Sequence, residues 1–227
     1  MKALEIIKMG SSLLKDKKIS SYILDSELLL SKTLKKSREE ILTDLNQIID
    51  TQKIIEFKRY LKRRSNNEPM AYILKEKEFW SKKFDVNKNT LIPRPETEIL
   101  VEQLIKNYKG KKISILDIGT GSGCIIISLL SNLIYSSGLG IDISKEAITI
   151  AKKNAIKHKL LNRIKFLTRS LNSIFERKFD LIVSNPPYIK RNEIKNLTDD
   201  IKRYEPRMAL DGGNDGLDLI KKVIYKS

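Results

Sequence analysis

The first third of the chain carries apolar residues at helical spacing. Stripes of this kind run over Ala3–Leu14, Ile23–Leu30 and Ile48–Leu61. Ser37-Arg38-Glu39-Glu40 has the pattern of a capping box, in which the serine caps a helix and the second glutamate reaches back to it. Asn66-Asn67-Glu68-Pro69 ends the last stripe. We therefore expect a small bundle of helices that packs or recognises a partner and carries no catalytic constellation.

A different pattern follows this bundle. Ala71–Trp80 and Lys83–Val86 are rich in aromatic and β-branched residues and flank a polar Ser81-Lys82 turn. This arrangement predicts a β-hairpin. Pro93 and Pro95 then hold the chain extended, and the second of them can open the next helix.

The remaining residues alternate short apolar runs with helical stretches. Such runs are typical of buried parallel strands, and the alternation predicts an α/β domain with a Rossmann-like sheet. The expected division is a helical domain at 1–68, a hairpin connector at 69–92 and the α/β domain at 93–227. The predicted strands are Ile113–Ile118, a run ending at Gly140-Ile141-Asp142, Ile164–Thr168 and Phe179–Ser184, and the predicted helices cover Cys124–Tyr135 and the residues after Ser144.

Composition narrows the class of protein. The chain has 227 residues, of which 41% are hydrophobic and 32% are charged, as in soluble globular proteins of one or two domains. No apolar run approaches the ~20 residues of a membrane span, and the N-terminus lacks a signal-peptide layout. The only cysteine, Cys124, fits a reducing cytoplasm. No metal-ligand spacing occurs, and we expect the single histidine, His158, to be solvated on a polar helix end.

The net charge of +16 favours polyanionic partners such as RNA or DNA. The basic residues are dispersed, however, so we interpret most of this charge as a solvated surface. The densest cluster joins Lys58-Arg59 to Lys62-Arg63-Arg64. This is the patch at which we expect a partner contact.

A glycine-rich turn, Gly119-Thr120-Gly121-Ser122-Gly123, joins the first predicted strand of the α/β domain to a helix. Glycines let a ligand approach the backbone, and a helix N-terminus favours negative charge. Asp142 ends the second strand, where it can accept both hydroxyls of a ribose. Cys124 stands where a nicotinamide fingerprint has its third glycine, and Asp117 can serve the amino group of an amino-acid-like ligand. Both points favour S-adenosylmethionine over a dinucleotide, and a dehydrogenase is a distant alternative.

The last predicted strand runs into Asn185-Pro186-Pro187-Tyr188. Prolines supply no N–H to a ladder, so the strand stops there, at the sheet end where ligands of α/β proteins bind. The side-chain carbonyl of Asn185 and the backbone carbonyl of Pro186 can accept the two N–H groups of a planar NH₂ group, and Tyr188 can stack on it. These four residues are therefore candidates for binding and orienting a nitrogen nucleophile. Alone, they do not separate a glutamine amide from an adenine amine.

Six segments, which include the glycine turn and the Asn-Pro-Pro-Tyr segment, carry recognisable motifs: Glu68–Ile73, Glu78-Phe79-Trp80, Leu91–Glu98, Asp117–Cys124, Ile182–Ile189 and Glu205–Leu217. Together they resemble the HemK/PrmC family, the protein-(glutamine-N5) methyltransferases of peptide chain release factors. The resemblance spans nearly the whole chain and keeps the family's order. It implies a helical domain that docks the release factor, a class I methyltransferase domain, S-adenosyl-L-methionine as cofactor, and the glutamine of a Gly-Gly-Gln loop as target. By position, Gly119–Gly123, Asp142 and Asn185 would contact the cofactor, and Asn185–Tyr188 would hold the glutamine amide.

The chain departs from the family at three places. Lys75 stands where the family has a glycine, so a positive φ there would cost free energy. Ser170 and Leu171 replace an acidic and an aromatic residue near the adenine, so we expect these cofactor contacts to have altered affinity. The chain ends at Lys226-Ser227 inside a predicted helix, whereas family members continue. We therefore expect an incomplete sheet with the Leu181 strand at an exposed edge, and a shortened product that is weakly active or inactive alone.

Two other functions stay open. One is an adenine-N6 methyltransferase of DNA or RNA, because Asn-Pro-Pro-Tyr serves that amine equally well and the basic charge suits the partner. No region resembles a separate target-recognition domain, and a flipped base needs a larger surface, so nucleic acid is not the favoured partner. The other is an inactive remnant that keeps only the helical binding module. We expect no membrane partner.

Overall fold

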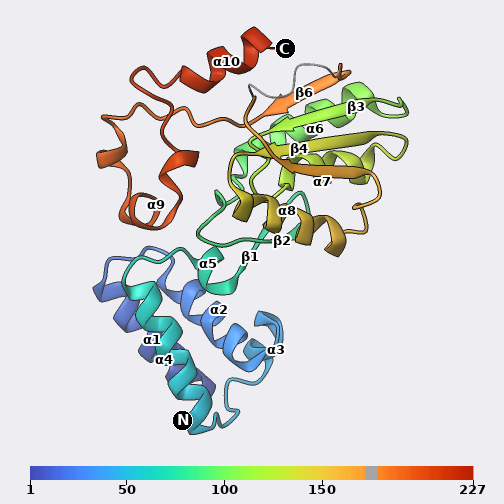
Figure 1. The fold of residues 1–227 in the computed structure, drawn as a ribbon. Helices are drawn as coiled ribbons and strands as arrows, with labels where there is room; N and C mark the ends of the chain where they lie inside the picture. Colours follow the sequence, from blue (N-terminus) through green and yellow to red (C-terminus); the bar gives the residue numbers. More distant parts are fainter. Residues whose placement is uncertain (172–177, 227) are drawn as a thin grey trace. The chain divides into compact units, whose positions relative to one another are not determined.

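The computed structural model describes residues 1–171 and 178–226. The chain divides into two compact units, Met1–Leu74 and Lys75–Ser227 (Figure 1). The functional division into docking domain, connector and methyltransferase domain stays a prediction. No helix in the described part of the chain is long and apolar enough to cross a membrane.

The first unit is entirely helical in its regular elements. Helices α1, α2 and α4 pack against one another around a shared apolar core that includes Ile6, Leu29 and Phe57. Both bonds of the predicted capping box form, because the Ser37 hydroxyl accepts from Glu40 N and the Glu40 carboxylate accepts from Ser37 N. The helices are α1 (Ala3–Asp16), α2 (Tyr22–Leu34), α3 (Arg38–Thr43), α4 (Thr51–Ser65) and α5 (Met70–Leu74).

Helix α4 begins later than the apolar stripe suggested. The Asp50 side chain accepts a hydrogen bond from Lys53 N and caps the helix, so Ile48 and Ile49 precede it. Ile48 instead pairs with Lys2 in an isolated antiparallel bridge, and 75% of its surface is exposed. Apolar spacing alone therefore placed the start of the expected helix too early, before its capping residue Asp50.

The basic cluster of α4 is divided by its pairing. Arg64 forms an ion pair with Asp25 of α2 at 2.6 Å, and the two side chains are only 13% and 5% exposed. Arg63 pairs with Glu68. Lys58, Arg59 and Lys62 are the members of the cluster that remain on the exposed face. The predicted patch is consequently smaller than its sequence implied.

The predicted hairpin exists, but its first strand is shorter than expected. Residues Met70–Leu74 form α5 rather than strand, with Tyr72 N and Ile73 N both bonded to the Pro69 carbonyl. A short aromatic and β-branched run does not distinguish a strand from a buried helical turn. The hairpin consists of β1 (Glu76–Phe79) and antiparallel β2 (Lys82–Asp85).

The hairpin turn lies one residue earlier than predicted. Its central residues are Trp80 and Ser81, with φ of 51° and 53°. Positive φ at both positions is the geometry of a type I′ turn, which matches the twist of two strands. Lys75, at the start of the hairpin, also has a positive φ of 63°, so the expected backbone cost of this non-glycine residue is present.

The second unit is built on a four-stranded parallel sheet in the order β5-β4-β3-β6, which confirms the predicted α/β class (Figure 1). Within the described residues β6 lies at one edge, as expected. The strands are β3 (Ser114–Ile118), β4 (Ser137–Asp142), β5 (Ile164–Thr168) and β6 (Leu181–Ser184), and three helices accompany them, α6 (Glu96–Tyr108), α7 (Cys124–Asn132) and α8 (Lys145–Lys157).

Side chains alternate between the two faces of the sheet. Ile115 and Val183 join the apolar cluster that contains residues of α6, α7 and α8, whereas Leu116 and Ile118 join a smaller cluster on the other face. Val223 packs against that second cluster. It belongs to the last of the elements η2 (Ile194–Asn196), α9 (Asp199–Tyr204), η3 (Arg207–Ala209) and α10 (Asp218–Lys226).

Helix α7 ends at Asn132 and not at Tyr135. The guanidinium of Arg163 donates to the carbonyls of Leu130, Leu133, Ile134 and Ser136, so it satisfies the acceptors left at the helix end. An arginine from a distant loop thus sets this boundary, which apolar spacing alone could not indicate.

Candidate functional site

The carboxyl ends of β3, β4 and β6 meet at one cavity. Register places Ile118 of β3 beside Ile141 of β4 and Ser184 of β6, so the residues that follow β3 and β6 emerge at the same edge. A cavity of about 250 Å³ opens there. Its lining contains these predicted site residues: Gly119, Gly121, Asp142, Ser170, Leu171, Asn185, Pro186 and Pro187.

Other predicted site residues lie around this lining. Asp117 is buried near the end of β3, Thr120 and Ser122 are buried within the glycine turn, and Gly123 is the N-cap of α7. Tyr188 lies beyond the prolines with 63% of its surface exposed, so its ring is accessible to a substrate from solvent. The predicted set therefore divides into residues that line the cavity and residues that support it.

Two glycines of the turn have different roles: Gly119 leaves space in the cavity, and Gly123 allows α7 and α8 to pack closely against the turn. Gly119 has a φ of 69°, and a Cβ added there would meet no atom within 4 Å, so its backbone is open to an approaching ligand. Gly123 has a φ of 79°, and a Cβ there would lie 3.0 Å from Ile127 Cδ1 and 3.3 Å from Ala151 Cβ. The first glycine leaves room for a ligand, whereas the last lets α8 pack against the turn.

Asp117 is fully buried at the end of β3. Its Oδ2 accepts a hydrogen bond of 2.6 Å from Thr120 Oγ1, and its Oδ1 has no partner among the described residues. Burial raises the pKa of the Asp117 carboxyl to about 7, the nearby charge of Asp142 adds to the rise, and the Thr120 hydroxyl opposes it. A buried carboxylate with an open acceptor fits a cationic amino group of a ligand.

Asp142 is already oriented by the backbone. Its Oδ2 accepts from Gly121 N at 3.0 Å, and its Oδ1 accepts from Ser144 N at 2.9 Å. Each carboxylate oxygen keeps a further lone pair, so both can also accept ribose hydroxyls. The predicted cap of α8 forms beside it, because Ser144 Oγ accepts from Ala147 N. The turn, the carboxylate and the helix cap hold each other in place.

The residues that hold Asn185 come from distant parts of the chain. The Asn185 Nδ2 atom donates to Thr97 Oγ1 of α6 at 3.2 Å, which leaves Oδ1 as the acceptor of that amide. The preceding Ser184 Oγ donates to the Ile118 carbonyl at 2.8 Å. The start of the Asn-Pro-Pro-Tyr segment is thus bound both to α6 and to β3.

The end of the same segment packs against residues 210–216. Ile189 N donates to the Leu210 carbonyl at 3.1 Å, and Gly212 N donates to the Ile189 carbonyl at 2.9 Å. A Cβ at Gly212 would lie 2.8 Å from Pro187 O and 2.8 Å from the Cα of Tyr188. Only glycine permits this approach, so the backbone of 210–216 acts as a brace for the prolines.

The buried carboxylate of Glu205 joins two chain segments that line the cavity, one before α6 and one after α9. Glu205, whose side chain is 1% exposed, accepts from Arg94 Nη2 at 2.6 Å and from Ile92 N at 3.2 Å. The segments on both sides of this pair line the cavity. Sequence reasoning flagged them by resemblance but gave no roles to their lining residues, which are Leu91, Pro206, Met208 and Ala209, together with Asn89 and Thr90.

His158 and Cys124 lie away from this cavity's lining. His158 lies at the end of α8 as expected, but it is half-buried rather than fully solvated, since its ring packs on Phe84 and its Nε2 is 3.1 Å from the Lys83 carbonyl. Burial lowers the pKa of this imidazole. Cys124 packs against the sheet core, and burial raises the pKa of its thiol to about 12, so it is an unreactive packing residue.

The parallel sheet, the glycine turn after β3 and the acidic end of β4 define a class I methyltransferase that uses S-adenosylmethionine. The residues fit that cofactor, since the cavity has an open glycine backbone and an oriented carboxylate, and a buried acid with a free acceptor lies behind its lining. Residues 5–74 match the family described as the PrmC N-terminal domain, and residues 95–213 match the methyltransferase small domain. The chain belongs to the release factor glutamine methyltransferase family, the protein-glutamine methyltransferases that sequence resemblance indicated.

Relatives of that name support this assignment over most of the chain. The Caulobacter vibrioides protein is 41% identical over 92% of this chain and 73% of its own length. The Clostridium botulinum protein is 40% identical over 98% of this chain and 80% of its own length. The protein of Buchnera aphidicola subsp. Baizongia pistaciae is 42% identical over 100% of this chain and 81% of its own length.

A solved structure shares the fold of the α/β unit. It is the hMettl16 catalytic domain in complex with the MAT2A 3'UTR hairpin 6, with a TM-score of 0.51 and 21% identity. The match covers 63% of this chain and 55% of that chain. At this identity the likeness supports the sheet architecture only.

Proposed function

We propose that this chain transfers a methyl group from S-adenosylmethionine to the side-chain amide nitrogen of the glutamine in the Gly-Gly-Gln motif of peptide chain release factors. The observation that carries the proposal is that Asn185 and Pro186 line the same cavity as Gly119, Gly121 and Asp142. A nitrogen held by the first pair is therefore close to a cofactor held by the others. The reaction would take place in the cytoplasm, where translation ends.

Each of the cofactor-binding residues contacts a different part of S-adenosylmethionine in this proposal. Asp117 binds the amino group of the cofactor, the backbone of Gly119–Gly123 binds its amino-acid end, and Asp142 binds its ribose. Ser170 and Leu171 also line the cavity and are assigned to the adenine, for which Leu171 offers an apolar surface. When bound, the cofactor supplies a methyl group that its sulfonium already activates.

The Asn-Pro-Pro-Tyr segment prepares the nucleophile. An amide nitrogen is a weak nucleophile because its lone pair is delocalised into the carbonyl. The Asn185 side-chain carbonyl and the Pro186 backbone carbonyl accept its two N–H groups and direct the lone pair toward the methyl carbon, while Pro187 shapes the loop and Tyr188 stacks on the amide plane. With the cofactor bound, the N–C bond would form as the S–C bond breaks and the sulfur leaves as a thioether, and the cationic N-methylated amide would then lose its proton to water. Orientation of this kind contributes up to roughly 7–11 kcal/mol in ideal cases.

The helical unit, Met1–Leu74, is the proposed docking module for the release factor. Its support is the match of residues 5–74 to the PrmC N-terminal domain. The exposed basic residues of α4, Lys58, Arg59 and Lys62, are the contact positions that we would test first. Replacing all three with alanine should raise KM for the release factor and leave KM for the cofactor unchanged.

The decisive experiment incubates the purified chain with S-adenosylmethionine and a release factor, and locates the product by mass spectrometry. We expect a single added methyl group on the Gly-Gly-Gln glutamine, and none with Asn185→Ala or with a release factor whose glutamine is alanine. Parallel reactions contain DNA or RNA and test the adenine-N6 alternative. Methyl transfer only to nucleic acid would overturn the proposal, and no transfer to any acceptor would favour an inactive binding module.

A further inference from the structure

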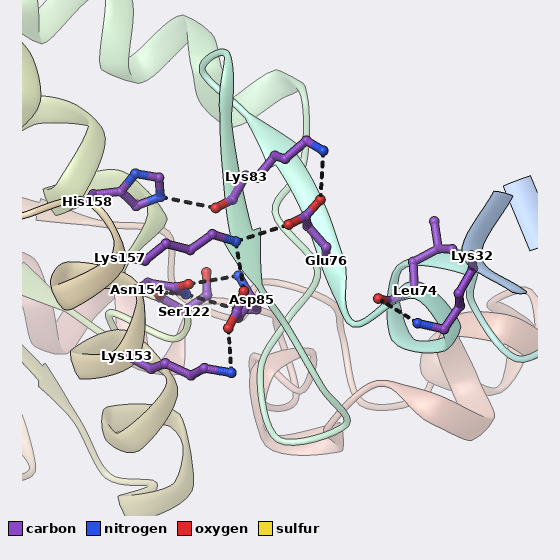
Figure 2. A network of polar contacts seen from close by, with 10 residues as sticks. All are labelled: Lys32, Leu74, Glu76, Lys83, Asp85, Ser122, Lys153, Asn154, Lys157 and His158. Carbon is purple, nitrogen blue, oxygen red and sulfur yellow. Dashed lines mark hydrogen bonds and ion pairs between the residues drawn. The ribbon is translucent and has the colours of Figure 1, made fainter. Parts of the chain in front are cut away.

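Asn154 of α8 is a fully buried amide, with 0% of its surface exposed. Its Nδ2 atom donates to the Asp85 carbonyl at 3.0 Å and to the Ser122 carbonyl at 2.9 Å, and its Oδ1 atom accepts from Asp85 N at 2.7 Å. Figure 2 shows this side chain between the hairpin and the helix, with Lys153 and Lys157 beside it. One side chain therefore bonds the end of β2 and the glycine turn together.

The three partners of Asn154 determine its chemistry. All three are backbone groups, and a backbone N–H only donates while a carbonyl only accepts. The amide must therefore present its NH₂ group to Asp85 O and Ser122 O and its oxygen to Asp85 N. A carboxylate cannot replace it, because an aspartate oxygen would face two carbonyl oxygens without a hydrogen between them.

Ser122 belongs to the turn that fits the cofactor. The neighbouring glycine, Gly123, approaches Ala151 Cβ, one helical turn before Asn154 on the same face of α8. A second contact of α8 with the turn thus lies directly beside the hydrogen bond to Ser122. Together the small side chain of Ala151 and the amide of Asn154 hold the turn at a set distance from the helix.

The other polar contacts that α8 makes in Figure 2 end at the hairpin. Lys157 Nζ bonds Glu76 and Asp85, and Lys153 Nζ bonds Asp85, all through exposed or half-buried side chains (Figure 2). These contacts hold β1 and β2 on α8 and do not involve the glycine turn. They provide a natural control, because the two lysines contact Asp85, as Asn154 does, but make no contact with Ser122.

We propose that Asn154 is a positioning residue for cofactor binding, which keeps the Gly119–Gly123 turn in its ligand-ready conformation by bonding the Ser122 carbonyl. The inference rests on the cofactor of the family and not on the identity of the methyl acceptor. Its test measures cofactor binding directly, so it can succeed or fail whether or not a release factor is methylated.

The experiment titrates S-adenosylmethionine into the full chain by calorimetry, for the wild type, Asn154→Asp, Asn154→Ala and Lys157→Ala. We expect Kd to rise about tenfold or more for both Asn154 variants and to stay within about twofold for Lys157→Ala. Circular dichroism and thermal unfolding establish that each variant is folded at the titration temperature. A folded Asn154→Asp chain with a wild-type Kd would overturn the proposal, since a purely structural role lowers Tm alone.

A second measurement covers the case in which neither Asn154 variant folds. In the ¹⁵N-labelled wild type, the side-chain NH₂ signals of Asn154 should shift when S-adenosylmethionine is added, because its acceptor Ser122 O lies in the binding turn. The side-chain signals of Asn132, at the far end of α7, serve as the control and should not move. Unchanged Asn154 signals at saturating cofactor would contradict the proposal.

Discussion

The Asn185 amide nitrogen donates to the Thr97 hydroxyl at 3.2 Å, although the two residues are 88 positions apart in the chain. The bond joins the residue after β6 to the first turn of α6. It directs the Asn185 NH₂ group toward the helix, so the opposite edge of the amide carries the acceptor oxygen. The proposed substrate contact therefore depends on a threonine that is not among the residues lining the cavity.

Thr97→Val should impair methyl transfer without impairing cofactor binding. Valine keeps the shape of threonine and removes the acceptor, so Asn185 loses one of the bonds that orient it. We expect kcat to fall about tenfold while KM for the cofactor stays unchanged, as measured by steady-state methylation of a release factor. Thr97→Ser retains the hydroxyl and should keep most of the activity. Equal losses in the two variants would show that packing, and not the hydrogen bond, matters.

Gly212→Ala should displace the Asn-Pro-Pro-Tyr segment. The added Cβ would lie 2.7 Å from Gly216 O and 2.8 Å from Pro187 O, and neither backbone atom can move without moving the site. We expect at least about a tenfold loss of kcat in the same methylation assay.

Gly110→Ala is the matched control for that change. Gly110 has a φ of 79°, but a Cβ there would meet no atom within 4 Å. Its replacement should cost about 1 kcal/mol of stability and leave kcat unchanged. Wild-type kcat in Gly212→Ala would show that residues 210–216 do not brace the segment.

Asp117 should make the stability of the cofactor-free chain depend on pH. Burial raises the pKa of its carboxyl to about 7, above the ordinary value of 3.8, so the folded chain binds more protons than the unfolded chain between these values. The group's contribution to stability is therefore full below about pH 4 and is lost as the pH rises toward 7. Asp117→Asn removes this loss, which is on the order of a few kcal/mol.

Urea unfolding at about pH 5 and about pH 8 measures the effect. Carboxyls that do not interact with Asp117 contribute equally to the wild type and to Asp117→Asn, so the comparison between the two chains isolates Asp117 together with its interaction with Asp142. The wild type should lose more unfolding free energy than the variant over this interval. Parallel pH profiles would show that the Asp117 carboxyl titrates normally.

The ion pair between Arg64 and Asp25 should stabilise the helical unit more than an exposed pair does. Removing one partner leaves the other charge buried, so Arg64→Ala should lower the free energy of unfolding by about 3 kcal/mol. Arg59 is the control, because it is 69% exposed and its nitrogen lies 3.9 Å from Glu56. Arg59→Ala should cost less than about 1 kcal/mol. Equal effects in denaturant unfolding would contradict this difference.

Local patterns were sufficient for much of the fold. The sheet strands follow from short apolar runs, and the caps formed by Ser37 and Ser144 follow from side chains that bond within three residues. The division between Met70–Leu74 and β1 did not follow, because aromatic and β-branched residues suit a strand and a buried helical turn equally. Cavity residues such as Asp142 and Asn185 were predictable because they stand at strand ends. Their actual roles in binding stay a prediction.

The roles of the supporting residues were not predictable from sequence. Thr97, Asn154 and Gly212 act through partners that are far away in the chain, and none has a local signature that separates it from an ordinary helix or loop residue. The same reason explains the basic cluster of α4, where Arg64 is neutralised by an aspartate of α2. Pairings of this kind depend on tertiary contacts.

The Arg94–Glu205 pair also has a consequence for the order of folding. The two residues are 111 positions apart, and their bond joins the segment before α6 to the segment after α9. During synthesis, the sheet strands and the glycine turn leave the ribosome well before Glu205 does. A nascent chain that stops short of Glu205 should thus hold strands without a closed cavity. Cofactor binding would begin only after Glu205 and the lining residues that follow it, such as Met208 and Leu219, have been synthesised.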